Sequence, residues 1–226
     1  SAGRVVLNSS AHTILADGSL VSAAGQGADS SGGELYVFSQ GSAVSQLGSF
    51  LDASSGDSGD GGFVEQSSRT GFVGARVDVS APAGEAGTFL IDPERITVQT
   101  GAGGGIPPAN TVYVAEDTIE AFGSGVFTLM TEDGVDFEAL NGGELTMMSD
   151  VDLDIVLTGG DATDAITFAN SSDTIALSGM GNFNYFSVTG TDVRDLKVSA
   201  EIRFISLDFN PDGGAAEGGS IVGNSS

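Results

Sequence analysis

A short strand pattern that begins at a glycine recurs along the first hundred residues, and this recurrence constrains the fold more than any other feature. The segments GRVVLNS, GELYVFS, GFVEQSS and GTFLIDP begin at Gly3, Gly33, Gly62 and Gly87, with spacings of 30, 29 and 25 residues. A repeat of this length is the sequence signature of a solenoid, in which each unit stacks on the last. The chain is therefore expected to coil upon itself.

The repeated units indicate strands rather than helices. Each glycine-led strand is followed by a second apolar strand and a loop of small residues, and the strands are bounded by Gly, Ser, Asp and Asn. Helical periodicity is nearly absent, so leucine-rich, ankyrin and tetratricopeptide repeats fit poorly. We predict an all-β solenoid in which strands stack in parallel and side chains alternate into a narrow core.

The stretch GTFLIDPERITVQTG illustrates how one coil changes direction. Phe89 and Ile91 alternate before a charged turn, and Ile96 and Val98 alternate after it. Asp at the first position and Pro at the second favour a type I turn over 92–95. The pattern predicts a corner between two faces of a coil, with all four apolar side chains pointing inward.

Two later segments show the same alternation. VDLDIVL places its apolar residues at 151, 153, 155 and 157 on one face. DLKVSAEIRFISLDF begins with an inward set that ends at Ile202 and Phe204, and then changes parity to Ile205, Leu207 and Phe209. A one-residue change of parity indicates a bend or a bulge.

One segment breaks the strand pattern. Ala115, Ile119 and Phe122 have helical spacing, and Gly123 follows as a C-cap. We predict a short helix over 115–122, preceded by the glycine-rich loop GAGGGIPPAN. The predicted organisation is a single β-helix over residues 1–226, with regular coils in 1–98, a loop and helix excursion in 99–125, and further coils in 126–226.

The charge balance excludes several classes of partner. There are 31 acidic and 7 basic residues, giving a net charge of −24, and no Lys or Arg occurs between Arg95 and Arg194. Such a surface repels nucleic acid and anionic membranes. It is interpreted as a solubilising coat, with a role for divalent cations as the alternative. There is no Cys, hence no disulfide, and no apolar run long enough to span a membrane.

Residues 30–120 resemble a known family. GGELYVFSQG, GSFLDASSG, GDGGFVEQSSRTGF and VDVSAPAGEAGTFLIDPERITV are similar, in order and spacing, to the haemagglutinin-like exoproteins of Gram-negative two-partner secretion. VYVAEDTIEAF resembles the sequence that usually follows in this family. Residues 125–226 resemble the family only in their general strand pattern. The resemblance implies a right-handed parallel β-helix, an outer-membrane secretion pore as partner, and for many members a role as adhesins. The family's secretion domain with its Asn-Pro motifs is not recognisable, so the resemblance is to a stalk segment.

No motif makes a convincing catalytic site. His12 is the only histidine and lies near Ser9, Ser10 and Asp17, but the spacing gives no reason to expect a triad. Acidic pairs occur at 133 and 136, 152 and 154, and 161 and 164, as in some β-helix enzymes that act on acidic polysaccharides. Those enzymes need bases to hold the substrate, and the middle hundred residues have none. We predict that the chain is not an enzyme and has no catalytic or cofactor-binding residues.

Calcium is the one cofactor that the sequence leaves open. GGDATDAIT places Gly159, Gly160, Asp164 and Ile166 as in the calcium-binding nonapeptide, but Ala162 replaces its third glycine and only one copy is present. DSGDGG at 57–62 lacks the ligand series of an EF-hand. Both segments are interpreted as solvated turns, so no metal-binding residue is predicted.

The favoured function is a non-catalytic segment of a large secreted adhesin or matrix fibre on a Gram-negative cell surface. It would act as a rigid spacer, with any binding to glycans or proteins coming from loops, chiefly 99–125. The first alternative is a subunit of a homopolymeric surface filament or layer that assembles end to end. A polysaccharide-acting β-helix enzyme comes third.

The two ends of the chain favour continuation of the coil. GRVVLNS is a regular strand with only Arg4 as a charged guard, and GGSIVGNSS offers Ile221 and Val222 without a cap. Open strand edges template further strands unless they are capped. We therefore expect the neighbouring coils to come from the same chain or from stacked copies.

Overall fold

The computed structural model describes residues 3–148, 150–159, 165–170, 172–177, 186–190, 201–203 and 207–209, and from residue 176 onward it describes the backbone alone. The first strands are β1 (Arg4–Ser9), β2 (His12–Leu15), β3 (Leu20–Ser22), β4 (Glu34–Ser45), β5 (Phe50–Asp52), β6 (Phe63–Val73), β7 (Arg76–Asp78), β8 (Thr88–Ile91), β9 (Arg95–Gln99) and β10 (Thr111–Ala115). After α1 (Glu116–Glu120) follow β11 (Gly125–Thr131), β12 (Gly134–Phe137), the 3-10 turn η1 (Asn141–Gly143), β13 (Glu144–Met147), β14 (Val151–Leu157), β15 (Ala165–Phe168), β16 (Thr174–Leu177), β17 (Phe186–Gly190), β18 (Glu201–Arg203) and β19 (Leu207–Phe209).

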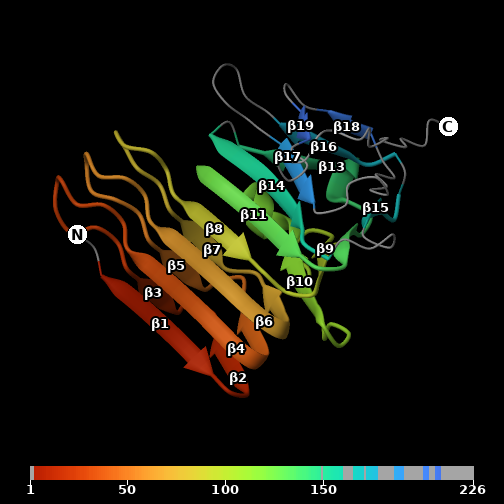
Figure 1. The fold of residues 1–226 in the computed structure, drawn as a ribbon, viewed down its shortest axis with the longest axis horizontal. Coiled ribbons are helices and arrows are strands. Elements are labelled where there is room, and N and C mark those ends of the chain that lie inside the picture. The colour runs from red at the N-terminus through yellow and green to blue at the C-terminus, as the bar shows by residue number, and fades with distance from the viewer. Residues whose placement is uncertain are drawn as a thin grey trace.

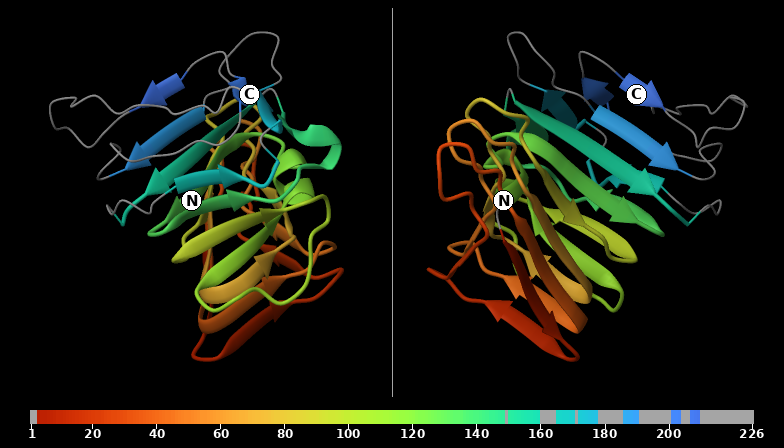
Figure 2. Two further views of the ribbon diagram at one scale, coloured as in Figure 1. Left: turned by 90° about the vertical axis from the view of Figure 1, so that its right-hand side faces the viewer. Right: turned by 60° about the vertical axis from the view of Figure 1, so that its left-hand side comes forward.

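The sheets of the described residues are built from parallel pairs. A 13-stranded sheet contains the ladder β1-β4-β6-β8-β11-β14-β17-β19, and two three-stranded sheets are β3-β5-β7 and β13-β16-β18. The strands of the large sheet succeed one another in one direction (Figure 1), and the sheet curls into a half-barrel (Figure 2). The predicted all-β class and parallel pairing are confirmed, whereas a closed right-handed β-helix remains a proposal.

The repeat spacing is explained by the stacking of the glycines that open each unit. The amide after each glycine donates to the glycine one unit earlier, as in Glu34 N to Gly3 O (3.1 Å), Phe63 N to Gly33 O (2.9 Å) and Thr88 N to Gly62 O (3.1 Å). A Cβ at Gly62 would lie 2.1 Å from the Gly33 carbonyl oxygen, and one at Gly87 would lie 1.8 Å from that of Gly62. At Gly62 and Gly87 the backbones therefore approach too closely for any side chain, whereas a Cβ at Gly3, in the first unit, would meet nothing within 4 Å.

The long strands β4 and β6 join two faces of the large sheet. Their first halves pair with β1 and β8, and their second halves pair with β2 and β10. The register between β4 and β6 shifts between Ser39 and Ser42, where the chain turns the corner. The first face therefore continues through β8 and β11, and the second continues through β10, β9 and β12.

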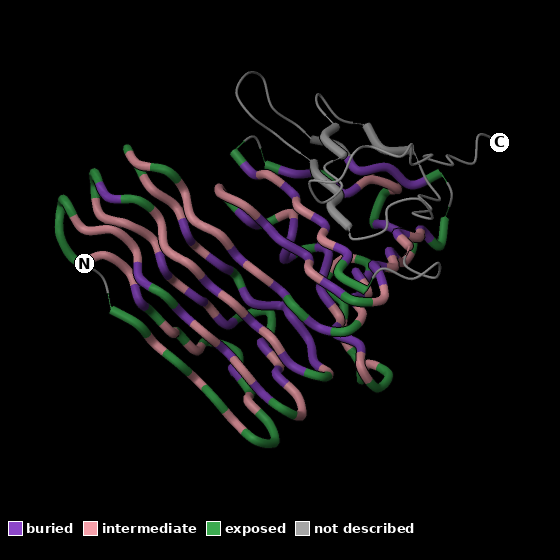
Figure 3. The backbone as a smooth tube through the Cα atoms, viewed as in Figure 1, coloured by how far each residue is buried: buried purple, intermediate pink, exposed green. Residues whose placement is uncertain are grey.

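The predicted corner at 92–95 is confirmed. β8 ends at Ile91 and β9 begins at Arg95, and the four alternating side chains around the turn have no exposed surface. Buried and more exposed positions alternate along most strands (Figure 3). The same alternation holds in β14, whose apolar residues at 151, 153, 155 and 157 are buried. The parity change predicted beyond residue 196 lies outside the described side chains.

The 99–125 excursion places one strand out of sequence order. β10 follows β9 in the chain but lies between β6 and β9 in the sheet. The predicted helix is shorter than expected, because α1 covers Glu116–Glu120, with Ala115 extended and Ala121 as C-cap. The predicted apolar face is nevertheless buried. Phe122 packs against Phe89 and Phe127, with ring centroids 6.4 and 5.3 Å apart.

Among the described residues, no helix is long and apolar enough to cross a membrane.

Candidate binding groove beneath the 100–110 loop

The loop of residues 100–110 doubles back along the outside of the coil. β9 and β10 are parallel neighbours, so the chain must return from the end of one strand to the beginning of the next. Positive φ angles at Gly101, Gly103, Gly104 and Gly105 make this return possible. The loop passes so close to β6 that a Cβ at Gly103 would lie 3.1 Å from the Phe72 ring.

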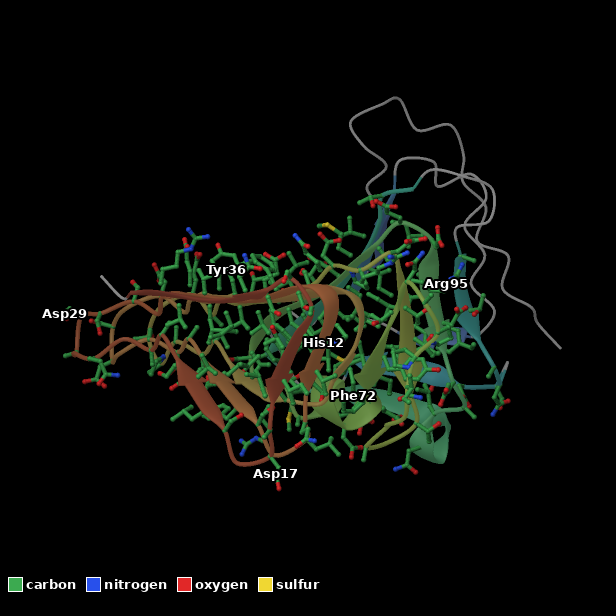
Figure 4. All side chains as sticks on the ribbon, turned by 90° about the horizontal axis from the view of Figure 1, so that it is seen from below. His12, Asp17, Asp29, Tyr36, Phe72 and Arg95 are labelled. Carbon is green, nitrogen blue, oxygen red and sulfur yellow. The ribbon has the colours of Figure 1, made fainter. Side chains whose placement is uncertain are left out.

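A groove of about 640 Å³ separates this loop from the outward side of β4 and β6. We call it the loop groove, and its lining consists of Asp17, Ser42, Val44, Gln46, Leu47, Gly48, Thr70, Gly71, Phe72, Gly103, Gly104, Gly105, Ile106 and Pro107. Figure 4 shows Asp17 and Phe72 on the side of the coil away from Tyr36. The volume lies within the range of small-ligand and peptide sites.

The floor of the loop groove belongs to an apolar rank on the outside of the coil. The register aligns Ile14, Val44 and Phe72 on successive strands, all pointing away from the core. Ile14 is 66% exposed, whereas Phe72 is 8% exposed because the loop covers it. Ile106, at the outer part of the loop, is 93% exposed. Exposed apolar side chains gathered on one face mark contact sites for partners.

Polar contacts fix both ends of the loop. Glu116 is fully buried, and its carboxylate accepts hydrogen bonds from Gly101 N at 2.6 Å and Asn141 N at 3.0 Å. Gln99 Oε1 accepts a hydrogen bond from Gly104 N at 2.9 Å. At the far end, Asn110, with a positive φ of 63°, accepts a hydrogen bond from Arg69. The base of the loop is therefore held rigidly on the coil.

His12 has a partner that sequence reasoning missed. Its Nδ1 lies 2.8 Å from Ser42 Oγ, and within the described part of the chain no hydrogen bond joins it to Ser9, Ser10 or Asp17. Ser9 Oγ instead accepts a hydrogen bond from the Ala11 amide. The signal was present in the repeat, because Ser42 lies one 30-residue unit after His12. The pair is exposed, and no carboxylate of the described residues is hydrogen-bonded to the ring.

The acidic pairs identified in the sequence lie in different surroundings. Asp133 and Asp136 converge on Arg95, whose guanidinium lies 4.0 and 3.0 Å from their carboxylates, and Thr167 donates to Asp136. Asp152 and Asp154 lie on the outward side of β14.

The turns considered for calcium are described in part. Gly160, Asp161, Ala162 and Asp164 lie outside the described residues, while Ile166 is buried in the core. Asp60 accepts a hydrogen bond from Glu85 N, as in an ordinary turn. No cluster of three or more metal-ligating side chains occurs among the described residues.

Among the described residues, three carboxyl groups have raised pKa values. Burial raises the pKa of Asp92, and the nearby Glu132 adds to the effect. Burial also raises the pKa of Glu65; the Ser67 hydroxyl opposes this shift and Asp92 supports it. Burial raises the pKa of Glu120 on α1. Ionisation of these carboxyl groups lowers the stability of the folded state, and protonation removes that loss.

Comparisons with known proteins found no match: no family model, no curated protein and no solved structure is significantly similar to this chain.

Proposed function

We propose that this chain is a non-catalytic, rigid scaffold segment of a large secreted adhesin or matrix fibre on a Gram-negative cell surface. In this proposal the coils close into a right-handed parallel β-helix. The observation that carries it is the register, because each strand of the first face pairs in parallel with the strand one coil earlier. The resemblance of residues 30–120 to haemagglutinin-like exoproteins supports the same assignment.

The loop groove is the proposed docking site of this scaffold. It is formed by the long loop between β9 and β10, and its apolar side chains come from both loop and coil. A rigid platform with an anchored loop is the arrangement by which repeat proteins carry binding functions. The acidic surface keeps the remaining outer face hydrated.

A deletion of one coil tests the scaffold proposal. Removal of residues 34–62 joins Gly33 to Phe63, and the register lets β6 replace β4 on β1. We expect this variant to remain folded by circular dichroism and to be displayed on the producing cell like the wild type. The matched control removes residues 34–48, half a coil, and is expected to lose both properties. Labelling of intact cells with an antibody to the outer face measures display.

Two results would contradict the scaffold proposal. Unfolding of the one-coil deletion would show that the coils are not interchangeable units. Exclusive labelling of permeabilised cells would show that the protein is not displayed at the surface.

The alternative that we propose is a homopolymeric filament, in which copies of the chain stack through their first coils. Val5, Leu7 and Val21 point toward the core but are only partly buried, because no strand covers β1 and β3 on that side within the described residues. By the alternation of a parallel ladder, the amide of Val6 points to the open edge. If the chain forms a filament, light scattering should detect particles whose length grows with protein concentration. The Val6→Pro variant should form shorter particles. Concentration-independent particles would exclude it.

A further inference from the structure

A second hollow lies on the outward side of β1, β4 and β6, on the first face of the sheet. Its volume is about 310 Å³, and we call it the Phe38 hollow; its lining consists of Asn8, Phe38, Ser39, Gln40, Ser67, Ser68 and Arg69. It shares no lining residue with the loop groove. Its size lies at the lower end of small-molecule sites, which suits one compact ligand ring.

The lining of the Phe38 hollow contains one aromatic ring, that of Phe38, and two further rings lie beside it outside the hollow. The register places Phe38 between Asn8 and Ser67 in one outward rank. The Phe38 ring lies 5.4 Å from that of Tyr36, and Tyr36 lies 5.6 Å from Phe63. These three rings are only partly buried, so they present apolar surface to solvent on a strand face where polar residues are the rule.

Tyr36 is held in place from two sides. The guanidinium of Arg4 stacks 4.5 Å from its ring centroid, and its hydroxyl donates to Glu34 at 3.3 Å. Tyr36 in turn packs against the Phe38 ring from outside the hollow, which restricts that ring before any ligand arrives and lowers the entropic cost of binding.

The rim of the Phe38 hollow carries hydrogen-bonding groups and no carboxylate. Asn8, Gln40 and Arg69 are exposed, and together they offer amide and guanidinium donors and amide acceptors. Arg69 Nε donates to Asn110 Oδ1 at 2.7 Å, which aims the rest of the guanidinium. Among the described residues, Arg69 has no carboxylate within 4.0 Å, although the chain carries 31 acids.

We propose that the Phe38 hollow binds a neutral pyranose unit of a glycan. A pyranose has an apolar C–H face, which stacks on the Phe38 ring, and a perimeter of hydroxyls, which both donate and accept hydrogen bonds at Asn8, Gln40 and Arg69. The net charge of −24 repels polyanionic glycans, and this selects neutral sugars. This site lies apart from the loop groove and adds a ligand class to the scaffold.

Saturation-transfer NMR with simple glycosides tests the site. The probes are methyl β-D-galactopyranoside and methyl α-D-glucopyranoside, with the methyl glycoside of glucuronic acid as the charged comparison. A single sugar on an open site is expected to bind with a Kd of about 1 mM, equivalent to roughly −4 kcal/mol. We expect transfer to the ring C–H protons of at least one neutral glycoside, and weaker transfer to the glucuronoside.

The first variant introduces a residue that the repeat already tolerates at this position. Phe38→Ser places at position 38 the residue found one coil later at Ser67, and it is expected to weaken binding at least tenfold. Arg69→Gln is expected to weaken binding while keeping an amide at the rim, and serves as the second variant if Phe38→Ser misfolds. Phe50→Ser, on the β3-β5-β7 sheet and in the lining of neither hollow, is expected to bind as the wild type.

Three outcomes would overturn the proposal: no transfer to any neutral glycoside, equal transfer to wild type and folded variants, or binding of the glucuronoside alone. None of them bears on the coil-deletion test, so a failure here leaves the scaffold proposal standing.

Discussion

The first coil and the middle coils follow the same alternation of side chains but bury them to different extents. Val5 and Leu7 in β1 are partly exposed, whereas their register partners Leu35 and Val37 in β4 are at most 1% exposed. The sequence pattern sets which way a side chain points. Its burial depends on whether strands lie on both sides, as they do for β4 and, within the described residues, do not for β1.

The middle coils gain a further contact from the excursion. Phe122, which follows α1, packs edge-to-face against Phe127 at 5.3 Å, and Phe127 packs against Phe89 at 5.1 Å. All three rings are at most 1% exposed. The 99–125 excursion thus adds an aromatic side chain to the core between β8 and β11.

The largest expected effect is at this aromatic cluster. Phe127→Ala removes a fully buried ring and should cost about 3–5 kcal/mol in the free energy of unfolding. Val5→Ala, in the partly exposed first coil, should cost less than about 1 kcal/mol, because little buried surface is lost. Urea denaturation measures both. Equal losses would remove the proposed difference between the two regions.

A smaller loss is expected where the glycines stack. Gly87→Ala would place its Cβ 1.8 Å from the Gly62 carbonyl oxygen, so the two coils must separate locally. We expect a loss of about 2–4 kcal/mol. Gly123→Ala is the matched control, because its Cβ would meet nothing within 4 Å and its stability should hardly change. Similar unfolding midpoints for the two variants would contradict close packing of the coils.

The anchored loop provides the next test. Glu116→Gln replaces one of two carboxylate oxygens that accept backbone amides with a donor, and should cost about 1–3 kcal/mol. Hydrogen exchange should accelerate first at Gly101 and Asn141, while β1 to β6 stay protected as in the wild type. Glu85→Gln, at an exposed turn, is the control. Unchanged exchange at Gly101 would show that Glu116 does not hold the loop.

The smallest effect concerns pH. A carboxyl with a raised pKa in the folded state binds protons more tightly there than when unfolded, so its contribution to stability rises as the pH falls. For Glu65 and Asp92 this stabilisation should appear as the pH falls through their raised folded-state pKa values and should be complete below the ordinary values of 4.5 and 3.8. Glu65→Gln should raise the Tm at pH 7 by about 1–3 °C, and Glu85→Gln should raise it less. A wild-type Tm that falls between pH 7 and 5 would contradict this sign.

Alternation and glycine spacing were sufficient to predict the coil corner. Alternation depends only on neighbouring residues of one strand, and glycine spacing depends only on the contact between adjacent coils. The four inward residues around Asp92–Arg95 and the apolar face of β14 followed directly. Insertion of β10 between β6 and β9 could not be predicted, since loop length does not specify which strands pair. The contacts of Arg95 with Asp133 and Asp136 depend on the same pairing, as do the loop groove and the cover over Phe72.

Disulfide trapping tests the stacking of coils most directly, because the chain has no cysteine of its own. Register partners in adjacent parallel strands lie about 4.8 Å apart, within the range that a disulfide spans. One cysteine pair is placed on each of the three sides of the coil, at Thr88 with Val126, Ser42 with Thr70, and Ser22 with Asp52. Each pair should oxidise rapidly in the folded monomer, and the control pair at Ser22 with Leu51, which point to opposite faces, should not. Failure of the register pairs, or equal oxidation of the control, would contradict the stacked-coil architecture.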